Sequence, residues 1–262
     1  MAIISMDMNR STFIMFMTVM LLLPSCFVKE DRDECPCWMT VEMPDRVGHD
    51  GSVVLRLHGN YDDGAMDYAY KVSESIKADV GILEYEVPRG SIGVSVVNSA
   101  RLVVPVGEQM DSLYGFFKPY HTRCESVKCD VELHKEFCTV SFTLVDEHYE
   151  SPYDIEVRGN VSGVSPWDLV PVSGAFKYAP VAEEGVYRVR IPRQVDASLE
   201  MVMLSNQEIV SRFPLGEYII KSGYDWAAKD LSDVSVALDL EKQQVMVTVS
   251  GWDGVVMMDI VI

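Results

Sequence analysis

Cysteine is the residue type in this sequence with the widest range of chemistry. Thiolates can bind zinc, form disulfides and accept lipid groups. The six cysteines are Cys26, Cys35, Cys37, Cys124, Cys129 and Cys138. The spacings Cys35-Pro36-Cys37 and Cys124-x4-Cys129 differ from those of the usual zinc ribbons and fingers, so we expect no metal site.

The other residue types used in catalysis show no arrangement that predicts an enzyme. The sequence contains no G-x-S-x-G, H-E-x-x-H, P-loop or G-x-G-x-x-G motif. The histidines lack ligand-like spacing and are His49, His58, His121, His134 and His148. Acidic residues are so numerous that a carboxylate pair at a glycosidase-like separation would carry no information. We therefore expect no catalytic residues and no cofactor.

The first residues predict an export signal that ends at a cysteine. An apolar block runs from Phe13 to Leu23, within the ~7–15 residues of a signal-peptide core and short of the ~20 that span a bilayer. The following residues complete Leu22-Leu23-Pro24-Ser25-Cys26, which is similar to a bacterial lipobox. We expect residues 1–25 to be removed and Cys26 to be lipidated. An ordinary signal peptide and an uncleaved membrane anchor are the alternatives.

Residues 26–37 predict an acidic tether between the lipid and the folded part. Phe27-Val28-Lys29-Glu30-Asp31 is similar to the tract that directs some lipoproteins to the outer face of the outer membrane. The expected location is therefore the cell outer membrane, lipid-anchored and exposed at the surface. An oxidising compartment would favour two disulfides and one thiol, with the pairing left open, among Cys35, Cys37, Cys124, Cys129 and Cys138.

Composition predicts an acidic globular protein. The apolar fraction of 48% is enough for a core. The sequence contains 22 Lys and Arg residues and 40 Asp and Glu residues, which gives a formal net charge of −18. Such a surface repels phosphate backbones, so nucleic acid is excluded as a partner.

Most of the sequence after the leader alternates apolar and polar residues with period two, as strands with one buried face do. The runs 234–240 and 245–249 predict a hairpin with one apolar face. Further expected strands are 52–58, 80–87, 93–97, 102–105, 138–144, 154–158 and 186–191. A single helical turn is expected at 111–114. The fold class is therefore all-β.

The number of expected strands suits two sandwich domains, because one sandwich needs about 100 residues. The polar stretch 146–152 interrupts the periodicity and is the expected linker. We place an N-terminal sandwich at 38–148 and a C-terminal one at 149–262.

Two features point toward sugars. Trp38, Trp167, Trp226 and Trp252 could include a platform that stacks on sugar rings, although tryptophans in a sandwich are more often core residues. Asp111-Ser112-Leu113 fits a very short pattern for O-glycosylation, which leaves a glycan on Ser112 as an open question.

Several short motifs follow one another in a characteristic order. An acidic Cys-Pro opening at 31–37 is followed by 111–114 and 131–137. The most specific part runs from Gly216-Glu217-Tyr218 through Tyr224-Asp225-Trp226 to a valine-rich end with Gly251-Trp252. The order resembles the FimB-type minor-fimbrium anchoring subunits, which are lipoproteins at the base of type V fimbriae in Bacteroidales. For Tyr224-Asp225-Trp226 we favour a structural role, as an aromatic corner that closes the second sandwich.

The resemblance implies two tandem transthyretin-like β-sandwich domains on a lipid-anchored amino terminus. It also implies an anchor that attaches a fimbrial stalk subunit by donor-strand contact and limits the length of the fimbrium. In this interpretation the anchor donates its last strand, whose candidate residues are Val255, Val256, Met257, Met258, Asp259, Ile260, Val261 and Ile262. The alternative is that these residues form the last core strand of the second domain.

Other functions stay open. A surface-exposed glycan-binding lipoprotein would use exposed aromatic residues such as Trp38 or Trp167. A tip or accessory fimbrial subunit would be cleaved after a basic residue such as Arg32 or Arg46. An exported hydrolase is disfavoured, because no constellation of nucleophile, base or metal is present.

Overall fold

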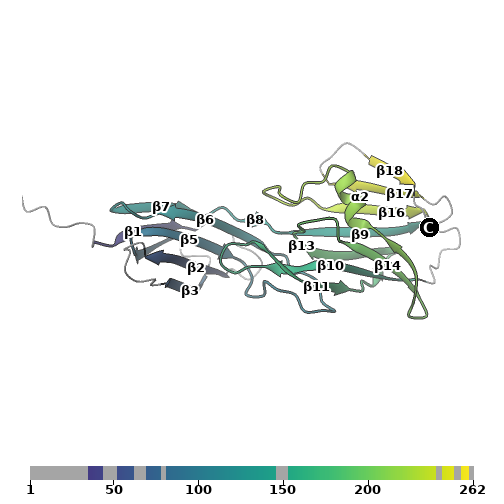
Figure 1. Cartoon of the computed structure of the whole chain (residues 1–262), viewed down its shortest axis with the longest axis horizontal. Coiled ribbons are helices and arrows are strands. Elements are labelled where there is room, and N and C mark those ends of the chain that lie inside the picture. Colours follow the sequence, from purple (N-terminus) through teal and green to yellow (C-terminus); the bar gives the residue numbers. More distant parts are fainter. Residues whose placement is uncertain are drawn as a thin grey trace, which may run out of the picture. The chain divides into compact units, whose positions relative to one another are not determined.

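The computed structural model describes residues 35–43, 52–61, 69–77, 81–145, 153–239, 244–250 and 255–259. The chain divides into a unit of Met1–Pro36 and a unit of Cys37–Ile262. The regular structure described is almost entirely β-strand, which confirms the all-β fold class (Figure 1). The expected leader 1–25 and Cys26 lie outside the described residues. No helix in the described part is both long and apolar enough to cross a bilayer.

Two sheets share the first core. Their strand orders are β4-β1-β7 and β3-β2-β5-β6-β8. Met39 of β1, Leu55 of β2 and Val94 of β5 are fully buried in the cluster between them. The strands are β1 (Cys37–Glu42), β2 (Ser52–Tyr61), β3 (Ala69–Lys77), β4 (Ile82–Val87), β5 (Gly90–Val97), β6 (Tyr114–His121), β7 (Ser126–Asp130) and β8 (His134–Lys135).

Two further sheets share the second core. Their strand orders are β11-β10-β14-β15 and β12-β13-β9-β16-β17-β18. Val140 of β9, Ile155 of β10 and Val236 of β16 are buried in this cluster. The strands are β9 (Phe137–Val145), β10 (Asp154–Val164), β11 (Pro171–Tyr178), β12 (Ala182–Glu183), β13 (Val186–Pro192), β14 (Glu200–Ser205), β15 (Glu208–Phe213), β16 (Val234–Asp239), β17 (Gln244–Val249) and β18 (Val255–Asp259).

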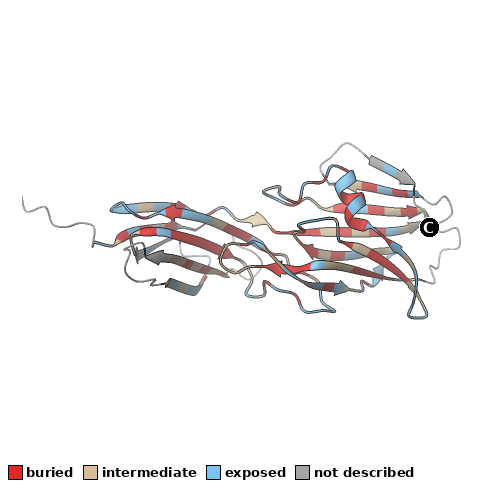
Figure 2. Cartoon of the chain, in the orientation of Figure 1, coloured by how far each residue is buried: buried red, intermediate tan, exposed pale blue. Residues whose placement is uncertain are grey.

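The expected alternation is present along the strands (Figure 2). In β16 the side chains of Val234, Val236 and Leu238 are buried, and the residues between them are more exposed. The predicted hairpin is confirmed, because β16 pairs antiparallel with β17 and Val236 lies opposite Val247. β-branched residues favour this extended, half-buried backbone.

Strand β9 precedes the domain boundary expected at residue 148, yet it pairs with strands that follow it. Val140 lies opposite Val189 of β13 and, on the other side, beside Val234 of β16. Residues 137–145 therefore belong to the second pair of sheets. The division into folding domains at 148 remains a prediction, and its expected linker, 146–152, lies outside the described residues.

In the described part of the chain, helix α2 (Leu215–Lys221) packs on the second core through Leu215, Tyr218 and Ile219. Pro214 precedes it, and Gly223 follows it with φ of +89°, a conformation that suits glycine and ends a helix. Lys221 bonds Glu217 one turn earlier at 3.1 Å.

Two of the expected elements are wrong. Residues 102–105 do not form a strand; Val103 makes only an isolated antiparallel bridge with Gly163 of β10. Residues 111–113 are not a helical turn, and Tyr114 already opens β6. The side chain of Asn98 holds this segment extended, donating to the Ser112 carbonyl at 2.9 Å and accepting from the Tyr114 amide at 2.7 Å.

A third buried cluster joins residues of both pairs of sheets. It contains Val97 from the end of β5, Phe137 from the start of β9 and Val164 from the end of β10. Leu102, Val104, Met110, Leu113 and Leu169 complete it. The segment 98–113 is therefore tied to this cluster through four buried side chains, while residues 105–108 are exposed.

Candidate assembly interface

Strand β18 lies at one edge of the six-stranded sheet, beside β17 (Figure 1). The two strands are antiparallel, with Gln244 opposite Asp259 at one end and Thr248 opposite Val255 at the other. Among the described strands, none pairs with the other side of β18. An edge strand presents a row of backbone N–H and C=O groups that can pair with a strand from another chain.

The charges on the edge strands distinguish β18 from most other edges. Asp259 is the only charged residue of β18, and Met257 is 68% exposed. Edge strands β3, β4, β7 and β15 each carry two or more charged residues. Strand β11 begins with Pro171 and has irregular register, and β8 and β12 are only two residues long. Charge, proline, bulges and short length all oppose strand addition, so β18 is the edge best suited to it.

The structure places part of the expected donor segment. Val255, Val256, Met257, Met258 and Asp259 form β18 within the protein's own sheet. Ile260, Val261 and Ile262 lie outside the described residues. Donation to another subunit therefore stays a prediction.

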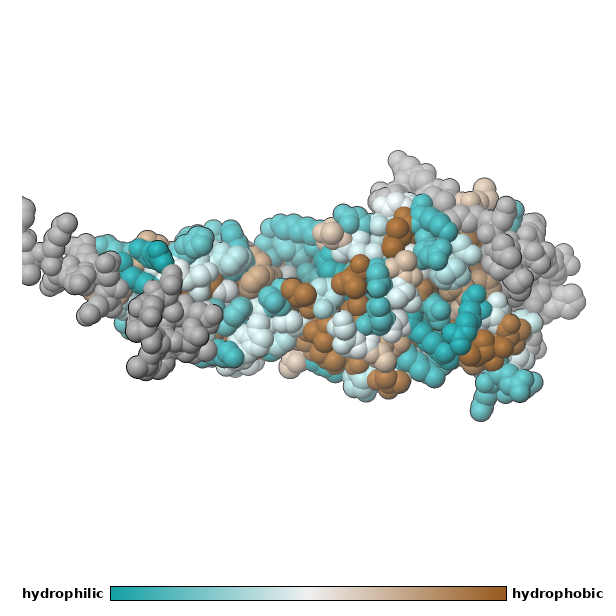
Figure 3. Space-filling view, viewed as in Figure 1, coloured by the Kyte–Doolittle hydropathy of each residue, from teal (hydrophilic) through white to brown (hydrophobic). Residues whose placement is uncertain are grey.

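Other exposed apolar side chains occur in small groups among hydrophilic ones, as Figure 3 shows for one face. Ile209 and Val210 are exposed on β15. The same strand also carries the charged residues Glu208 and Arg212. A turn through Asn206 and Gln207, with φ of 51° and 68°, joins β14 to β15.

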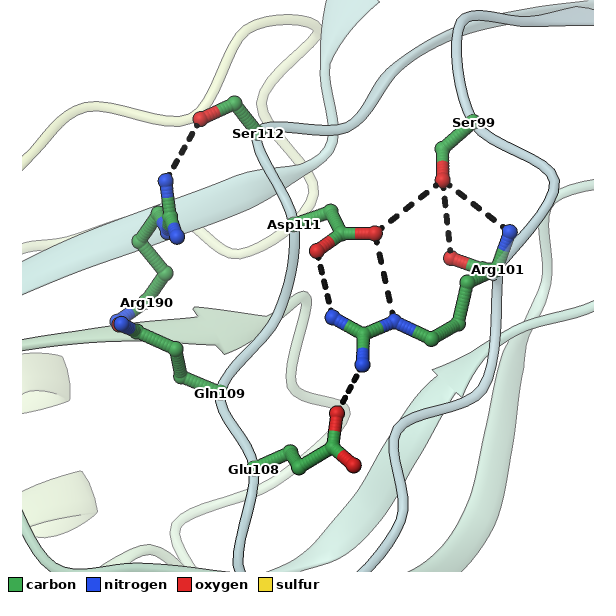
Figure 4. Close-up of polar contacts among 7 residues, drawn as sticks. All are labelled: Ser99, Arg101, Glu108, Gln109, Asp111, Ser112 and Arg190. Atoms are coloured by element: carbon green, nitrogen blue, oxygen red, sulfur yellow. Dashed lines mark hydrogen bonds and ion pairs between the residues drawn. The ribbon is translucent and has the colours of Figure 1, made fainter.

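The segment around Ser112 is held by two arginines (Figure 4). Arg101 donates to Asp111 through Nε at 3.3 Å and through Nη2 at 2.5 Å. The bonds from Arg101 hold the pKa of Asp111 below its ordinary value. Arg190 of β13 donates from Nη1 to the Ser112 hydroxyl at 2.9 Å. A glycan on Ser112 stays an open question; it would replace the hydroxyl hydrogen and leave the oxygen able to accept this hydrogen bond.

Ser112 and Arg190 line a polar cleft of about 560 Å³. Its other charged residues are Lys135, Glu183, Arg188 and Asp233. Lys135 bonds Asp233 at 2.5 Å, and the Asp233 carboxylate also accepts from the Thr139 amide at 2.7 Å. The Lys135–Asp233 ion pair and the bond to the Thr139 amide indicate a structural role for these residues. Among the described residues that line the cleft, none forms a pair of nucleophile and activating base.

The Tyr224-Asp225-Trp226 motif has the structural role expected of it. Tyr224 and Trp226 are buried in the second core, with their rings at 4.7 Å in a T-shaped contact. The Tyr224 hydroxyl donates to the Ser232 carbonyl at 2.7 Å. Arg193 donates to the Ala228 carbonyl at 2.8 Å and to the Glu136 carboxylate at 2.8 Å.

The remaining expected sites are dispersed. Trp38 is 55% exposed on β1, Trp167 is half-buried against the His58 ring, and Trp252 lies outside the described residues. Among the described residues, no three His, Cys, Asp or Glu side chains are grouped as metal ligands. His49 and His148 lie outside that part of the chain.

Sequence patterns missed the arginines that organise these sites. The expected strand 186–191 includes Arg190 but gives it no role, and no motif singles out Arg101 or Arg193. Two of them have partners that are distant in sequence: Arg193 bonds Glu136, and Arg190 bonds Ser112. Only the fold brings these two pairs together, whereas Arg101 bonds Asp111 on the same connecting segment.

No protein-family model matches the sequence, and no curated protein is significantly similar to it in sequence. Solved structures, in contrast, share the fold. A candidate polysaccharide-binding protein from Bacteroides thetaiotaomicron superposes with a TM-score of 0.59 at 13% identity, over 85% of this chain and 98% of that chain. A candidate adhesin from Bacteroides ovatus superposes with a TM-score of 0.58 at 13% identity, over 86% of this chain and 96% of that chain.

The fimbrial anchor protein Mfa2 from Porphyromonas gingivalis superposes with a TM-score of 0.54 at 9% identity, over 83% of this chain and 98% of that chain. At these identities the likeness establishes a shared fold. The expected resemblance to fimbrial proteins of Bacteroidales is confirmed at that level.

Proposed function

We propose that this protein is a fimbrial anchor subunit. In this proposal, lipid at Cys26 holds the protein in the outer membrane, and β18 joins it to a stalk subunit. The supporting observation is a fold shared with an anchor protein over 98% of that protein's chain, combined with a sparsely charged edge strand near the C-terminus. The role is structural and involves no catalysis.

The joint follows from the chemistry of strand addition. When β18 is donated, it loses its ladder to β17 and gains one or two ladders in a stalk subunit whose sheet lacks a strand. Because β18 lies at the edge, its release leaves the pairing of β16 with β17 in place. An amino terminus occupied by lipid offers no further joint, so growth of the fimbrium stops at the anchor.

The test uses the tagged protein in the organism that encodes it. Gently extracted membranes are run on denaturing gels with and without boiling. We expect a boiling-sensitive ladder that contains a stalk subunit, and its loss when residues 254–262 are deleted. A lone monomer in unboiled samples from the intact protein would overturn the strand joint.

The lipid is tested separately. A Cys26→Ser variant should leave the membrane fraction and lose incorporation of labelled fatty acid. An ordinary signal peptide predicts no label at Cys26 in the wild type. This variant keeps the whole of β18, so anchoring and strand addition are measured independently.

A second candidate function is a surface lipoprotein that binds glycans. It is favoured by the exposed ring of Trp38 and by the fold shared with a candidate polysaccharide-binding protein. Soluble glycan binding that is lost in Trp38→Ala, without any ladder on gels, would support it. A tip or accessory subunit would instead show a mature amino terminus created by cleavage after Arg32 or Arg46.

A further inference from the structure

Two cysteines far apart in sequence meet at one end of the first pair of sheets. Cys37 is fully buried and opens β1. Cys124 is exposed and lies in the connection from β6 to β7. β1 and β7 are parallel neighbours, and the amide after Cys37, that of Trp38, donates to the carbonyl of Glu125 at 2.9 Å. Burial, and after it the neighbouring Cys124 side chain, raises the pKa of the Cys37 thiol, in keeping with this closeness.

Two of the other cysteines are held elsewhere. Cys129 is fully buried in the first core. Cys138 is fully buried in the second core. Cys35 is exposed and precedes Cys37 by two residues, so it is the competitor that an experiment must separate from Cys37.

We propose that Cys37 and Cys124 form a disulfide that fixes the first strand to the body of the protein. This rests on the proposed export, because the bond needs an oxidising compartment. The oxidant is the disulfide of an exported thiol oxidoreductase. Two thiols lose two electrons and two protons, and that disulfide is reduced to two thiols.

Exposure determines the order of the exchange. The Cys124 thiolate attacks a sulfur of the oxidoreductase disulfide, one thiolate of that enzyme leaves, and a mixed disulfide remains on Cys124. The Cys37 thiolate then attacks the Cys124 sulfur, and the second thiolate of the oxidoreductase leaves. Burial raises the pKa of Cys37 to about 11, which makes Cys37 the poorer first nucleophile.

The bond has a mechanical consequence. β1 is the central strand of the order β4-β1-β7, and its residues Cys37, Met39 and Val41 are fully buried. Among the described strands it is also the first after the proposed lipid site. A pull on the amino terminus would load a covalent bond at Cys37, which would keep the first residue of β1 beside the start of β7.

Peptide mapping tests the bond on the full chain. The protein is isolated from its native membrane, alkylated without reductant, denatured and digested with trypsin. Trypsin separates Cys124 in 124–128, Cys129 in 129–135 and Cys138 in 136–158, while 33–46 holds both Cys35 and Cys37. We expect 33–46 linked to 124–128, lost completely on reduction. Alkylated Cys124 in the unreduced protein would overturn the proposal.

Two cysteine variants determine whether Cys37 or Cys35 is the partner of Cys124. The link should persist in Cys35→Ser and be absent from Cys124→Ser, whose substitution is at an exposed site. Loss of the link in Cys35→Ser would assign the bond to Cys35 and overturn the proposal. Neither measurement needs a stalk subunit, so failure of the anchor function and failure of the disulfide give different results.

A second measurement tests the mechanical tie. A site for a specific protease is inserted in 44–50, between β1 and β2, and the protein is cut and then denatured. Without reductant, the amino-terminal fragment should stay attached on gels, and reductant should release it. The same insertion in Cys124→Ser should release the fragment under both conditions. Release from the parent without reductant would show that the tie is absent.

Discussion

Arg193 donates from Nε to the carboxylate of Glu136 at 2.8 Å, and both side chains are largely buried. Burial raises the pKa of Glu136, and the neighbouring guanidinium opposes that shift. Arg193 also donates to the carbonyls of Trp226 and Ala228. The pair therefore connects the start of β9 with the aromatic corner.

Removing the positive charge of Arg193 should lower the free energy of unfolding. In Arg193→Met the Glu136 carboxylate stays buried without its partner, and we expect a loss of about 3–5 kcal/mol in the free energy of unfolding at pH 8. Because the folded-state pKa of Glu136 is already raised and rises further without Arg193, the folded state binds the proton more tightly than the unfolded state. Stability then falls as pH rises above the ordinary value of 4.5. Urea unfolding at pH 5 should show a smaller loss than at pH 8.

The exposed pair of Arg212 with Glu200, at 3.1 Å, supplies the control. Arg212→Met should cost less than about 1 kcal/mol, because solvent screens an exposed pair. An equal loss for Arg193→Met at both pH values would contradict an ionised and buried Glu136.

Gly163 is required by a close approach of two backbones. A Cβ at this position would lie 2.0 Å from the carbonyl oxygen of Leu102 and 2.7 Å from the Cα of Val103. In Gly163→Ala the segment 102–104 must move, and overpacking of this kind costs about 1–3 kcal/mol. Thermal unfolding measures the loss. Gly81→Ala is the matched control, since a Cβ there meets nothing within 4 Å and should change stability by no more than about 1 kcal/mol.

Local pattern was enough to predict most strands and the fold class. The alternation in 138–144 and 234–249 appears as β9, β16 and β17, because the period of two directly reports which side chains face the core. The helix α2 was missed, since seven residues carry too little periodicity to be distinguished from a buried strand.

Long-range pairing was not accessible in the same way. The alternation of β9 does not reveal that its neighbours are β13 and β16, which come later in the chain. The closeness of Cys37 to the connection that holds Cys124 likewise depends on the parallel pairing of β1 with β7. Such contacts depend on topology, and a single sequence contains no local signal for them.

The place of β9 leads to a prediction about fragments. A fragment of residues 149–262 lacks β9, the strand between β13 and β16. Val189 and Val234 then both lose Val140, their shared neighbour in the sheet. We expect it to be unfolded, and a fragment of residues 137–262 to show β-sheet circular dichroism with a cooperative thermal transition. A cooperatively folded 149–262 fragment would instead support the boundary expected at 148.

The exposed edge of β18 leads to a prediction that separates assembly from folding. Met257 is 68% exposed, so Met257→Lys should change the free energy of unfolding by no more than about 0.5 kcal/mol. A lysine on a donated strand would have to enter a core or an interface, where an unpaired charge is strongly unfavourable. We expect the boiling-sensitive ladder to be reduced at least tenfold. Ile209→Lys, at a 43% exposed position on the edge strand β15, should leave the ladder intact. If Ile209→Lys abolishes the ladder and Met257→Lys does not, the stalk subunit joins at β15, and β18 serves only as the last strand of its own sheet.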